Sequence, residues 1–351
     1  MSLSVHIKKD FGGFLLSVDL EHESGIMGLL GASGCGKSLT LKSIAGIVTP
    51  DEGRIVLNGR VLFDSEQHMN LSPQVRNVGY LFQNYALFPN MTVEKNILCG
   101  LNREKDRNIR REKLENVLEM MELTSLRRSL PHQLSGGQQQ RAALARILVS
   151  GPELLLLDEP FSALDSYLRD SLQIQVKELL ENYGKDVLLV SHSRDEIYHL
   201  CSRMALIDRG KVFGTGGTKE IFADPGTRVG AVLTGCKNIV RARKSGEYEV
   251  EVPEWGICLK TGKPVGDHVC AIGIRAHYFN SRARENVFPV VYADRMEEPF
   301  ETTVLFRYAG QKEDSTPVWW RIPKDRVPDK MPEQLGIAPQ NVLLLYPEDN
   351  R

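Results

Sequence analysis

The first two-thirds of the chain alternates short apolar runs with longer amphipathic ones, a pattern typical of a sheet flanked by helices. The apolar runs at 25–30 and 154–157 have no polar interruption, so each predicts a strand that is buried on both faces. The runs at 54–59, 77–82 and 187–192 predict further strands of the same sheet. The fold class expected from this order is α/β.

Helical spacing predicts the elements between these strands. Four apolar residues between 114 and 121 recur at i, i+3, i+4 and i+7, so they form one face of a helix. A second helical pattern runs from 168 to 183 and stops at Gly184, a residue type that commonly ends helices. The helix-rich stretch at about 87–150 is expected to form a helical subdomain.

The pattern changes after residue 222, where turn-forming residues become frequent and short β-rich segments separated by Gly and Pro follow. Closely spaced turn signals of this kind predict a small barrel or sandwich. The chain is therefore expected to contain an α/β domain at 1–229 and a small β-rich domain, similar to an OB or TOBE fold, at 230–351.

Composition and charge limit the classes of function. The 351 residues carry 44 Lys and Arg against 45 Asp and Glu, which argues against a generally basic nucleic-acid binder and gives no attraction to acidic lipid. No apolar run approaches the roughly 20 residues that a bilayer span needs. The six cysteines are scattered without a C-x-x-C pair, and the first residues lack a secretory pattern, so we expect a cytosolic chain with reduced thiols.

The segment GASGCGKS at 31–38 fits the G-x-x-x-x-G-K-S pattern of a phosphate-binding loop, and it lies between a predicted strand and a helix. Glycines allow backbone N–H groups to surround a polyphosphate, and the helix N-terminus adds partial positive charge. Lys37 is expected to neutralise the β- and γ-oxygens, and Ser38 to ligate Mg²⁺. By itself the loop indicates only a nucleotide polyphosphate, because GTPases and kinases share it.

Two carboxylates follow the buried strand at 154–157. Asp158 and Glu159 come at its carboxyl end, which is where ligands bind in open parallel sheets. Asp158 is expected to hold Mg²⁺ through water, and Glu159 to act as the base that polarises an attacking water. An Asp–Glu pair after an apolar strand is common, so this assignment depends on the loop at 31–38.

The segment LSGGQQQR at 134–141 predicts a second helix start that is able to receive an anion. Ser135 and Gln138 have the spacing of a capping box, and Gly136 and Gly137 leave backbone N–H groups open. A merely well-capped helix is the plain alternative. Only a helix and a strand separate Gln138 from Asp158, and this geometry does not easily bring the helix start to the γ-phosphate that Lys37 binds. We therefore expect this helix start to contact the nucleotide of a second copy of the chain, arranged head-to-tail.

These segments, followed by SALD at 162–165 and VSHS at 190–193, occur in the order found in the ATP-binding cassette (ABC) ATPases and resemble that family over residues 1–230. The resemblance implies an antiparallel homodimer that holds two ATP molecules, with Mg²⁺, at its interface. The implied nucleotide contacts are Phe11, Gly31, Ser33, Gly34, Cys35, Gly36, Lys37, Ser38 and Leu39 of one chain and Ser135, Gly136, Gly137 and Gln138 of the other, with Asp165 joining the two sites.

The resemblance also implies which residues act on the attacking water. His192 would contact the γ-phosphate and hold the geometry of the water beside the base Glu159. Gln83 would reach both Mg²⁺ and that water. The stretch at about 86–98 would receive a helix from a membrane permease subunit, although an ordinary surface loop before a helix fits the same residues.

Several positions leave alternatives open. Phe11 would stack on adenine, but Phe14 is close by and either ring suits a plain core position. Trp319 and Trp320 are candidates for a binding lip, although adjacent tryptophans in a strand more often place one in the core and one on the surface. Cys35 lies at a helix start, which lowers a thiol pKa and suggests a redox switch, but the family tolerates Cys there without one.

Within the family, one cassette followed by a β-rich appendage is similar to the ATPase subunits of bacterial solute importers. The segments at 53–66, 71–83 and 190–200 are similar to those of the molybdate importer, and sulfate, iron, polyamine and sugar importers share much of the same sequence. The resemblance implies an ATP-hydrolysing subunit, peripheral on the cytoplasmic face of the membrane. It would drive uptake of molybdate or a related oxyanion, with a solute-binding protein as an indirect partner and an oxyanion as candidate ligand of 230–351.

Other classes of ATPase fit less well. A nucleic-acid maintenance ATPase of the same head type interrupts its cassette with long coiled coils, and no sustained heptads occur between Lys37 and Ser135. A translation factor of cassette type carries two cassettes, whereas this chain has one set of motifs. A small-ligand sensor built on the C-terminal domain is compatible with transport but does not explain the ordered motifs.

Overall fold

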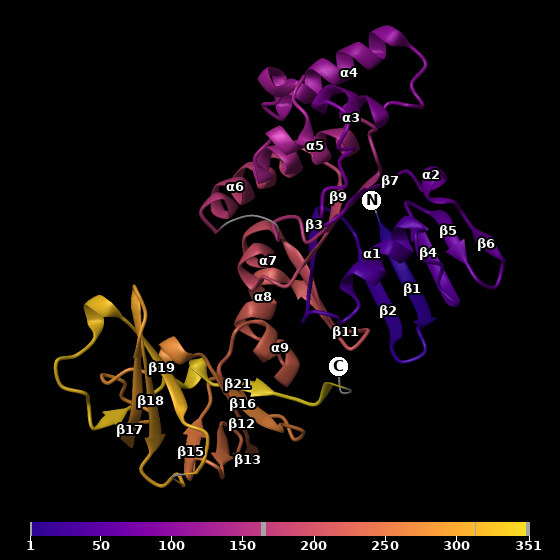
Figure 1. Ribbon diagram of the computed structural model, residues 1–351. Coiled ribbons are helices and arrows are strands. Elements are labelled where there is room, and N and C mark those ends of the chain that lie inside the picture. Colours follow the sequence, from indigo (N-terminus) through magenta and orange to yellow (C-terminus); the bar gives the residue numbers. More distant parts are fainter. Residues whose placement is uncertain (1, 163–165, 313, 349–351) are drawn as a thin grey trace. The chain divides into compact units, whose positions relative to one another are not determined.

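The structure, a computed structural model, describes residues 2–162, 166–312 and 314–348 (Figure 1). The chain divides into two compact units, Met1–Thr218 (unit 1) and Lys219–Arg351 (unit 2), each with its own hydrophobic core. The division falls at the start of helix α8 (Thr218–Ala223), and the boundary expected at 229/230 lies inside helix α9 (Arg228–Leu233). No helix in the described ranges has the length and apolar character needed to cross a bilayer.

One large mixed sheet of eleven strands forms the frame of unit 1. Its parallel part contains, in spatial order, β7 (Val78–Leu81), β8 (Leu154–Asp158), β9 (Asp186–Ser191), β3 (Ile26–Leu30) and β10 (Arg203–Asp208). The sheet continues, mostly antiparallel, through β11 (Lys211–Gly217), β2 (Leu15–His22), β1 (Leu3–Asp10), β4 (Glu52–Leu57), β5 (Arg60–Asp64) and β6 (Met69–Asn70). The expected α/β class is confirmed.

The burial of the strands follows their apolar patterns. Every residue of β3, β8 and β9 is buried, as uninterrupted apolar runs predict for central parallel strands. In β1, by contrast, residues on one face are buried and several between them are exposed, so the antiparallel part has one face on the core. Because parallel strands point the same way, the ends of β7, β8 and β9 meet at one edge of the sheet.

The helices of unit 1 form two groups. Helices α1 (Lys37–Ala45), α6 (Ser166–Tyr183) and α7 (Arg194–Leu200) contact strands or helices beside the sheet, and α2 (Pro73–Arg76) is a single turn before β7. Helices α3 (Val93–Cys99), α4 (Arg107–Met120) and α5 (Gly136–Leu148) contact one another, with the short helices η1 (Thr124–Leu126) and η2 (Pro131–Gln133) between α4 and α5. This second group lies within the stretch expected to be helical.

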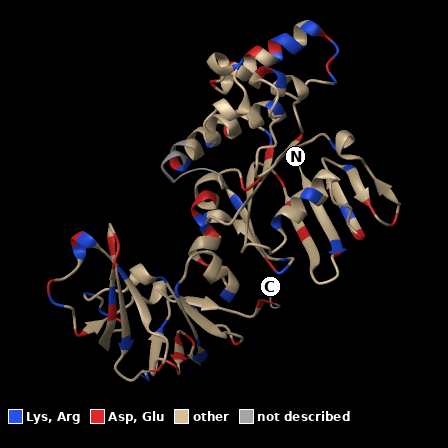
Figure 2. Cartoon of the chain, in the orientation of Figure 1, with Lys and Arg blue, Asp and Glu red and all other residues tan. Residues whose placement is uncertain are grey.

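The sequence patterns describe these helices well. The four apolar residues between 114 and 121 are all buried, which confirms the predicted apolar face of α4. The Lys and Arg residues of α4, at 107, 110, 111 and 113, lie in its first half and appear as blue segments in Figure 2. Helix α6 ends at Tyr183, and Gly184 follows with φ of +65°, the left-handed conformation expected of a helix-ending glycine.

Unit 2 is rich in short strands, as expected. Within its described residues, the strands form three sheets. The first contains β12 (Asn238–Arg241), β16 (Ala271–Ile274) and β21 (Leu343–Leu345), and the second contains β13 (Arg243–Gly246), β14 (Glu249–Val252) and β15 (Ile257–Lys260). The third contains β17 (Phe288–Glu297), β18 (Glu301–Tyr308), β19 (Val318–Pro323) and β20 (Gln334–Leu335). The remaining short helices are η3 (Ala276–Tyr278), η4 (Lys324–Arg326) and η5 (Pro339–Asn341). Trp320 belongs to the core while Trp319 is half-buried, the arrangement that alternation along a strand produces.

Candidate nucleotide site

The segment at 31–38, here called the phosphate loop, joins β3 to α1. Gly36 caps the N-terminus of α1 with φ of +107°, and a Cβ atom there would lie 2.7 Å from Leu16 Cδ1, so only glycine fits. Residues 32–34 are exposed. Within the described residues, the backbone N–H groups of Ser33, Gly34 and Gly36 have no protein acceptor. The loop therefore offers a set of free N–H donors at a helix start, which suits an anionic ligand.

Lys37 lies at the first position of α1 with its side chain turned back onto the phosphate loop. Its exposed fraction is only 4%, and Nζ donates to the carbonyl oxygens of Gly31 and Ala32, each at 2.9 Å. A buried ammonium needs such acceptors, because desolvation of an unpaired charge is costly. Phosphate oxygens can replace these carbonyl oxygens as acceptors for the Lys37 ammonium, so Lys37 fits the expected role in polyphosphate binding.

Asp158 is the last residue of β8, and its exposed fraction is 6%. Its Oδ1 accepts a hydrogen bond from Ser38 Oγ at 2.7 Å, and its Oδ2 accepts one from Tyr80 Oη at 2.7 Å. A serine hydroxyl beside a carboxylate is the hard oxygen donor set that Mg²⁺ prefers. The structure therefore brings together two of the residues predicted to hold magnesium, and their chemistry fits that ion.

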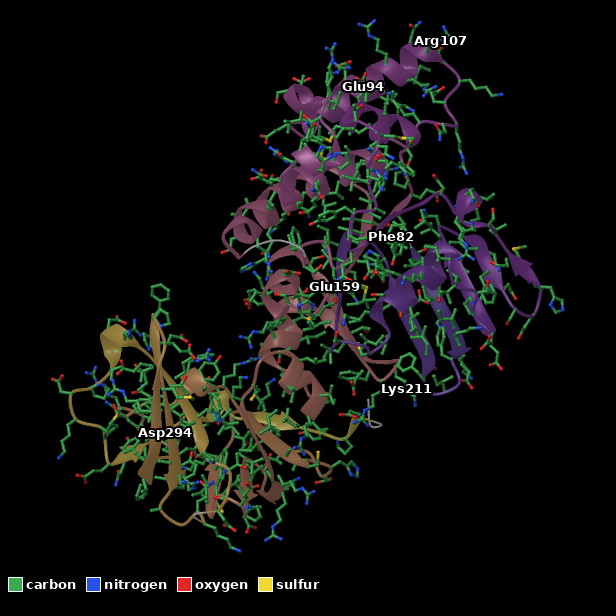
Figure 3. The ribbon with its side chains drawn as sticks, in the orientation of Figure 1. Phe82, Glu94, Arg107, Glu159, Lys211 and Asp294 are labelled. Carbon is green, nitrogen blue, oxygen red and sulfur yellow. The ribbon has the colours of Figure 1, made fainter. Side chains whose placement is uncertain are left out.

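Glu159 contacts the two other residues that the sequence assigned to the attacking water. Its Oε2 accepts a hydrogen bond from Gln83 Nε2 at 3.3 Å, and its Oε1 lies 3.3 Å from His192 Nδ1. The three residues come directly after or shortly after β7, β8 and β9, whose carboxyl ends lie side by side. Figure 3 labels Glu159 and Phe82, the neighbour of Gln83.

The backbone at Glu159 is strained. Its φ is +46°, in the left-handed region that costs a non-glycine residue roughly 1 to 2 kcal/mol. Hydrogen bonds hold this conformation: Glu159 N donates to Val190 O at 3.0 Å, and both Ser162 Oγ and Ser162 N donate to Glu159 O, at 2.9 Å and 3.2 Å. The turn directs the Glu159 carboxylate toward Gln83 and His192 at the edge of the sheet.

The loop after Gln83 is strained as well and is held from α5. Tyr85 and Ala86 have φ of +58° and +46°. The Arg146 guanidinium donates to Ala86 O at 2.7 Å and to Tyr85 O at 3.0 Å. The Tyr85 side chain is buried, and its hydroxyl donates to Pro160 O at 3.3 Å. The last turn of α5 thus fixes the loop that carries Gln83.

The chain is similar to known proteins. The family model for the ABC transporter family matches residues 16–162. The chain is 36% identical to the spermidine/putrescine import ATP-binding protein PotA of Oleidesulfovibrio alaskensis, over 82% of each chain. The chain belongs to the ABC transporter family.

Other relatives and a solved structure agree with this assignment. The chain is 43% identical to the putrescine transport ATP-binding protein PotG of Escherichia coli K12, over 62% of this chain and 56% of the relative. It is 39% identical to the molybdenum import ATP-binding protein ModC of Aliivibrio fischeri, over 64% and 60%. The match thus spans little more than half the length of these two relatives. The dimeric ATP-binding cassette MJ0796, in a post-hydrolysis state with ADP and Pi, matches with a TM-score of 0.51 and 27% identity, over 62% of this chain and 99% of that one.

The ABC signature segment at 134–141 forms the predicted capping box. Ser135 caps α5, with its Oγ accepting from Gln138 N at 3.4 Å, while Ser135 N donates to Gln138 Oε1 at 2.9 Å. In the described part of the chain, no hydrogen bond or ion pair joins Ser135, Gly136 or Gly137 to the phosphate loop. Among the described residues, the hydrogen bonds of this helix start are therefore made within its own segment. Asp165 lies outside the described residues.

The remaining predicted contacts differ in exposure. Phe11 is 43% exposed at the β1–β2 turn, whereas Phe14 packs against the core, so Phe11 is the ring that is open to a ligand. Leu39 is half-buried and also contacts the core. Cys35 is buried, and burial raises the pKa of its thiol. A raised thiol pKa opposes the thiolate that a redox switch requires.

Sequence reasoning missed Tyr80 and Arg146. Tyr80 belongs to no motif, and nothing in its local sequence indicates that its hydroxyl reaches Asp158. Arg146 lies in the last turn of a helix, where a cation commonly meets carbonyl groups of the same helix, whereas here it contacts a loop sixty residues earlier in the sequence. Both contacts depend on elements that are distant along the chain.

Proposed function

We propose that this chain is the ATP-hydrolysing subunit of a bacterial ABC importer. One observation carries the proposal: the ends of three parallel strands bring Gln83, Glu159 and His192 together, and Asp158 and Ser38 are hydrogen-bonded at the same edge of the sheet. Phosphate binding, an oxygen-rich magnesium site and a carboxylate base are the parts that ATP hydrolysis requires.

Each residue then has a defined task. The free N–H groups of the phosphate loop and the Lys37 ammonium bind the β- and γ-phosphates. Ser38, Asp158 and Gln83 would hold Mg²⁺, which neutralises charge on the phosphates when bound. Glu159 accepts the proton of the attacking water, and the hydrogen bond from Gln83 together with nearby His192 keeps its carboxylate in place.

The head-to-tail homodimer remains part of the proposal. The capped start of α5 has open N–H groups, and among the described residues it makes no hydrogen bond to its own phosphate loop, which supports a role for Ser135, Gly136 and Gly137 in the nucleotide site of a second copy. Gln138 completes the capping box and so fixes the direction of those N–H groups. We propose Asp165 as the residue that joins the two sites.

The helices of unit 1 offer a place for a membrane partner. A groove of about 610 Å³ is lined by α3 and α4 residues that include Glu94, Leu98, Arg107 and Arg110. It borders the stretch at 86–98, which supports the proposed docking of a permease helix there. The subunit would then lie on the cytoplasmic face of the membrane, and a solute-binding protein would act on it only through the permease.

For the solute we propose molybdate or a related oxyanion. Unit 2 contains a cavity of about 850 Å³ whose lining includes His277, Arg282, Arg321 and Arg326, and guanidinium groups suit oxyanions. The alternative is an importer of another solute such as a polyamine, which the identity to PotG and PotA supports equally. Sulfate, iron and sugar importers remain further alternatives.

Two measurements test the proposal. Purified protein with ATP and Mg²⁺ should release phosphate, and the rate per molecule should rise with protein concentration as dimers form. No phosphate release at any concentration, alone or with the permease, would contradict the ATPase assignment. The melting temperature is then measured with molybdate, tungstate, sulfate or spermidine. The solute that binds is the one that raises it, because only a bound ligand stabilises the folded state.

A further inference from the structure

Tyr80 lies on β7 beside the strand that ends in Asp158. In the parallel pairing of the two strands Tyr80 is opposite Leu156, two residues before Asp158. The phenol ring packs against the core of unit 1 and lies 4.5 Å, between ring centroids, from Phe82. These contacts place the Tyr80 hydroxyl 2.7 Å from Asp158 Oδ2.

The two oxygens of Asp158 therefore have different partners. Oδ1 is bonded to Ser38, the residue expected to ligate Mg²⁺, while Oδ2 is bonded to Tyr80. A carboxylate with a hydrogen bond at only one oxygen can rotate about its Cβ–Cγ bond. The second hydrogen bond, from Tyr80, removes that freedom. The Tyr80 hydroxyl is the donor in this bond, because a carboxylate oxygen only accepts.

We propose that Tyr80 is a positioning residue that orients the Asp158 carboxylate for the metal–nucleotide complex. The inference rests on the proposed function, because it assumes that Asp158 faces Mg²⁺. A residue that does not touch the metal can donate a hydrogen bond to a carboxylate that does. Such hydrogen bonds commonly contribute about 10- to 100-fold to metal affinity. Tyr80 donates such a bond from a strand that carries none of the phosphate-binding residues.

The experiment compares Tyr80→Phe with a matched control. Phe keeps the ring and removes only the hydroxyl. Tyr183→Phe removes a hydroxyl that donates to the backbone oxygen of Pro152 at 3.1 Å, away from Asp158. Mn²⁺ replaces Mg²⁺ as a paramagnetic probe, and its free concentration is measured by electron paramagnetic resonance in the presence of ADP. The same proteins are assayed for phosphate release over a range of Mg²⁺ concentrations.

We expect Tyr80→Phe to weaken Mn²⁺ binding by about 10-fold and to raise the Mg²⁺ concentration for half-maximal hydrolysis to a similar extent. Saturating Mg²⁺ should restore most of the rate, a recovery that a merely structural role would not produce. Tyr183→Phe should match the unmodified protein. Unchanged Mn²⁺ affinity in Tyr80→Phe would overturn the inference while leaving the proposed function intact.

Two further outcomes are decisive. If the unmodified protein shows neither metal-dependent ADP binding nor hydrolysis, the proposed function itself fails. If Tyr80→Phe does not fold, judged by its thermal unfolding transition, Tyr80→Met is titrated instead, because an unbranched apolar chain fills the same space flexibly. Failure of both variants to fold would assign Tyr80 to stability and overturn the positioning role.

Discussion

His192 Nδ1 lies 3.3 Å from Glu159 Oε1, so an imidazole that follows β9 meets a carboxylate that follows β8. The Glu159 side chain is 16% exposed and that of His192 is 58% exposed. The base is thus sheltered while its neighbour is open to solvent, where a phosphate would enter. Gln83 donates to the other carboxylate oxygen of Glu159, so these three residues surround the place that we propose for the attacking water.

Glu159→Gln tests the base. Gln keeps the size of the side chain but does not accept a proton, so we expect turnover to fall by about 100- to 10,000-fold while ATP binding persists. ATP-bound dimer should accumulate, as measured by size-exclusion chromatography. Glu23→Gln, an exposed change before β3, is the control and should keep full turnover. Near-normal hydrolysis by Glu159→Gln would exclude Glu159 as the base.

Lys37→Ala tests the phosphate loop. The variant loses the ammonium that we propose binds the phosphates, so we expect no measurable ATP binding by calorimetry. Lys42→Ala, on the same helix but outside the loop, should bind ATP normally. An unchanged ATP affinity in Lys37→Ala would count heavily against the assignment of the loop.

Ser135→Arg tests the two-chain site. A bulky cation at the start of α5 should block hydrolysis, because we propose that the nucleotide of a neighbouring chain contacts this position. ATP binding to the isolated monomer should be unaffected. Ser125→Arg, at an exposed position in η1, serves as the control. Loss of monomer binding in Ser135→Arg would place the segment in the chain's own site and contradict the head-to-tail homodimer.

Arg146→Lys tests the link between α5 and the loop that carries Gln83. A lysine cannot donate to Tyr85 O and Ala86 O in the fixed fork of a guanidinium, so the strained loop should open more often. We expect faster hydrogen exchange at 84–88 and hydrolysis reduced by about 10-fold, since charge-assisted hydrogen bonds contribute about 1.5 to 3 kcal/mol each. Arg110→Lys on α4 should change neither. Unaltered exchange would mean that Arg146 does not hold the loop.

His22 predicts how stability depends on pH. Burial lowers its pKa below the ordinary 6.5, although nearby Asp186 opposes the shift. Above pH 6.5 the imidazole is neutral in both states and this contribution to stability is complete. The pKa of His22 is lower in the folded state than in the unfolded state. As the pH falls below 6.5, His22 is therefore protonated in the unfolded chain before it is protonated in the folded one, and the folded state loses stability.

Urea unfolding at pH 7.5 and pH 5.5 measures this loss. His22→Gln should show a smaller difference in stability between the two pH values than the unmodified protein. The exposed His132→Gln should leave the difference unchanged. An equal pH dependence in His22→Gln would show that other groups cause it.

Local patterns in the sequence were sufficient for much of the fold and for several site residues. Uninterrupted apolar runs predicted β3 and β8, and the spacing of apolar residues predicted the buried face of α4. The capping box of Ser135 and Gln138 was also predictable. All these features depend on residues within one or two turns of a helix or one strand, so the order of residues along the chain is enough to indicate them.

Other features were decided only by the tertiary structure. The bond from Tyr80 to Asp158 and that from Arg146 to Ala86 join residues 78 and 60 positions apart. Likewise, only packing distinguished exposed Phe11 from core-packed Phe14. The order of strands in the sheet determines which side chains become neighbours. That order results from the burial of the whole sheet, which no single segment of the sequence contains.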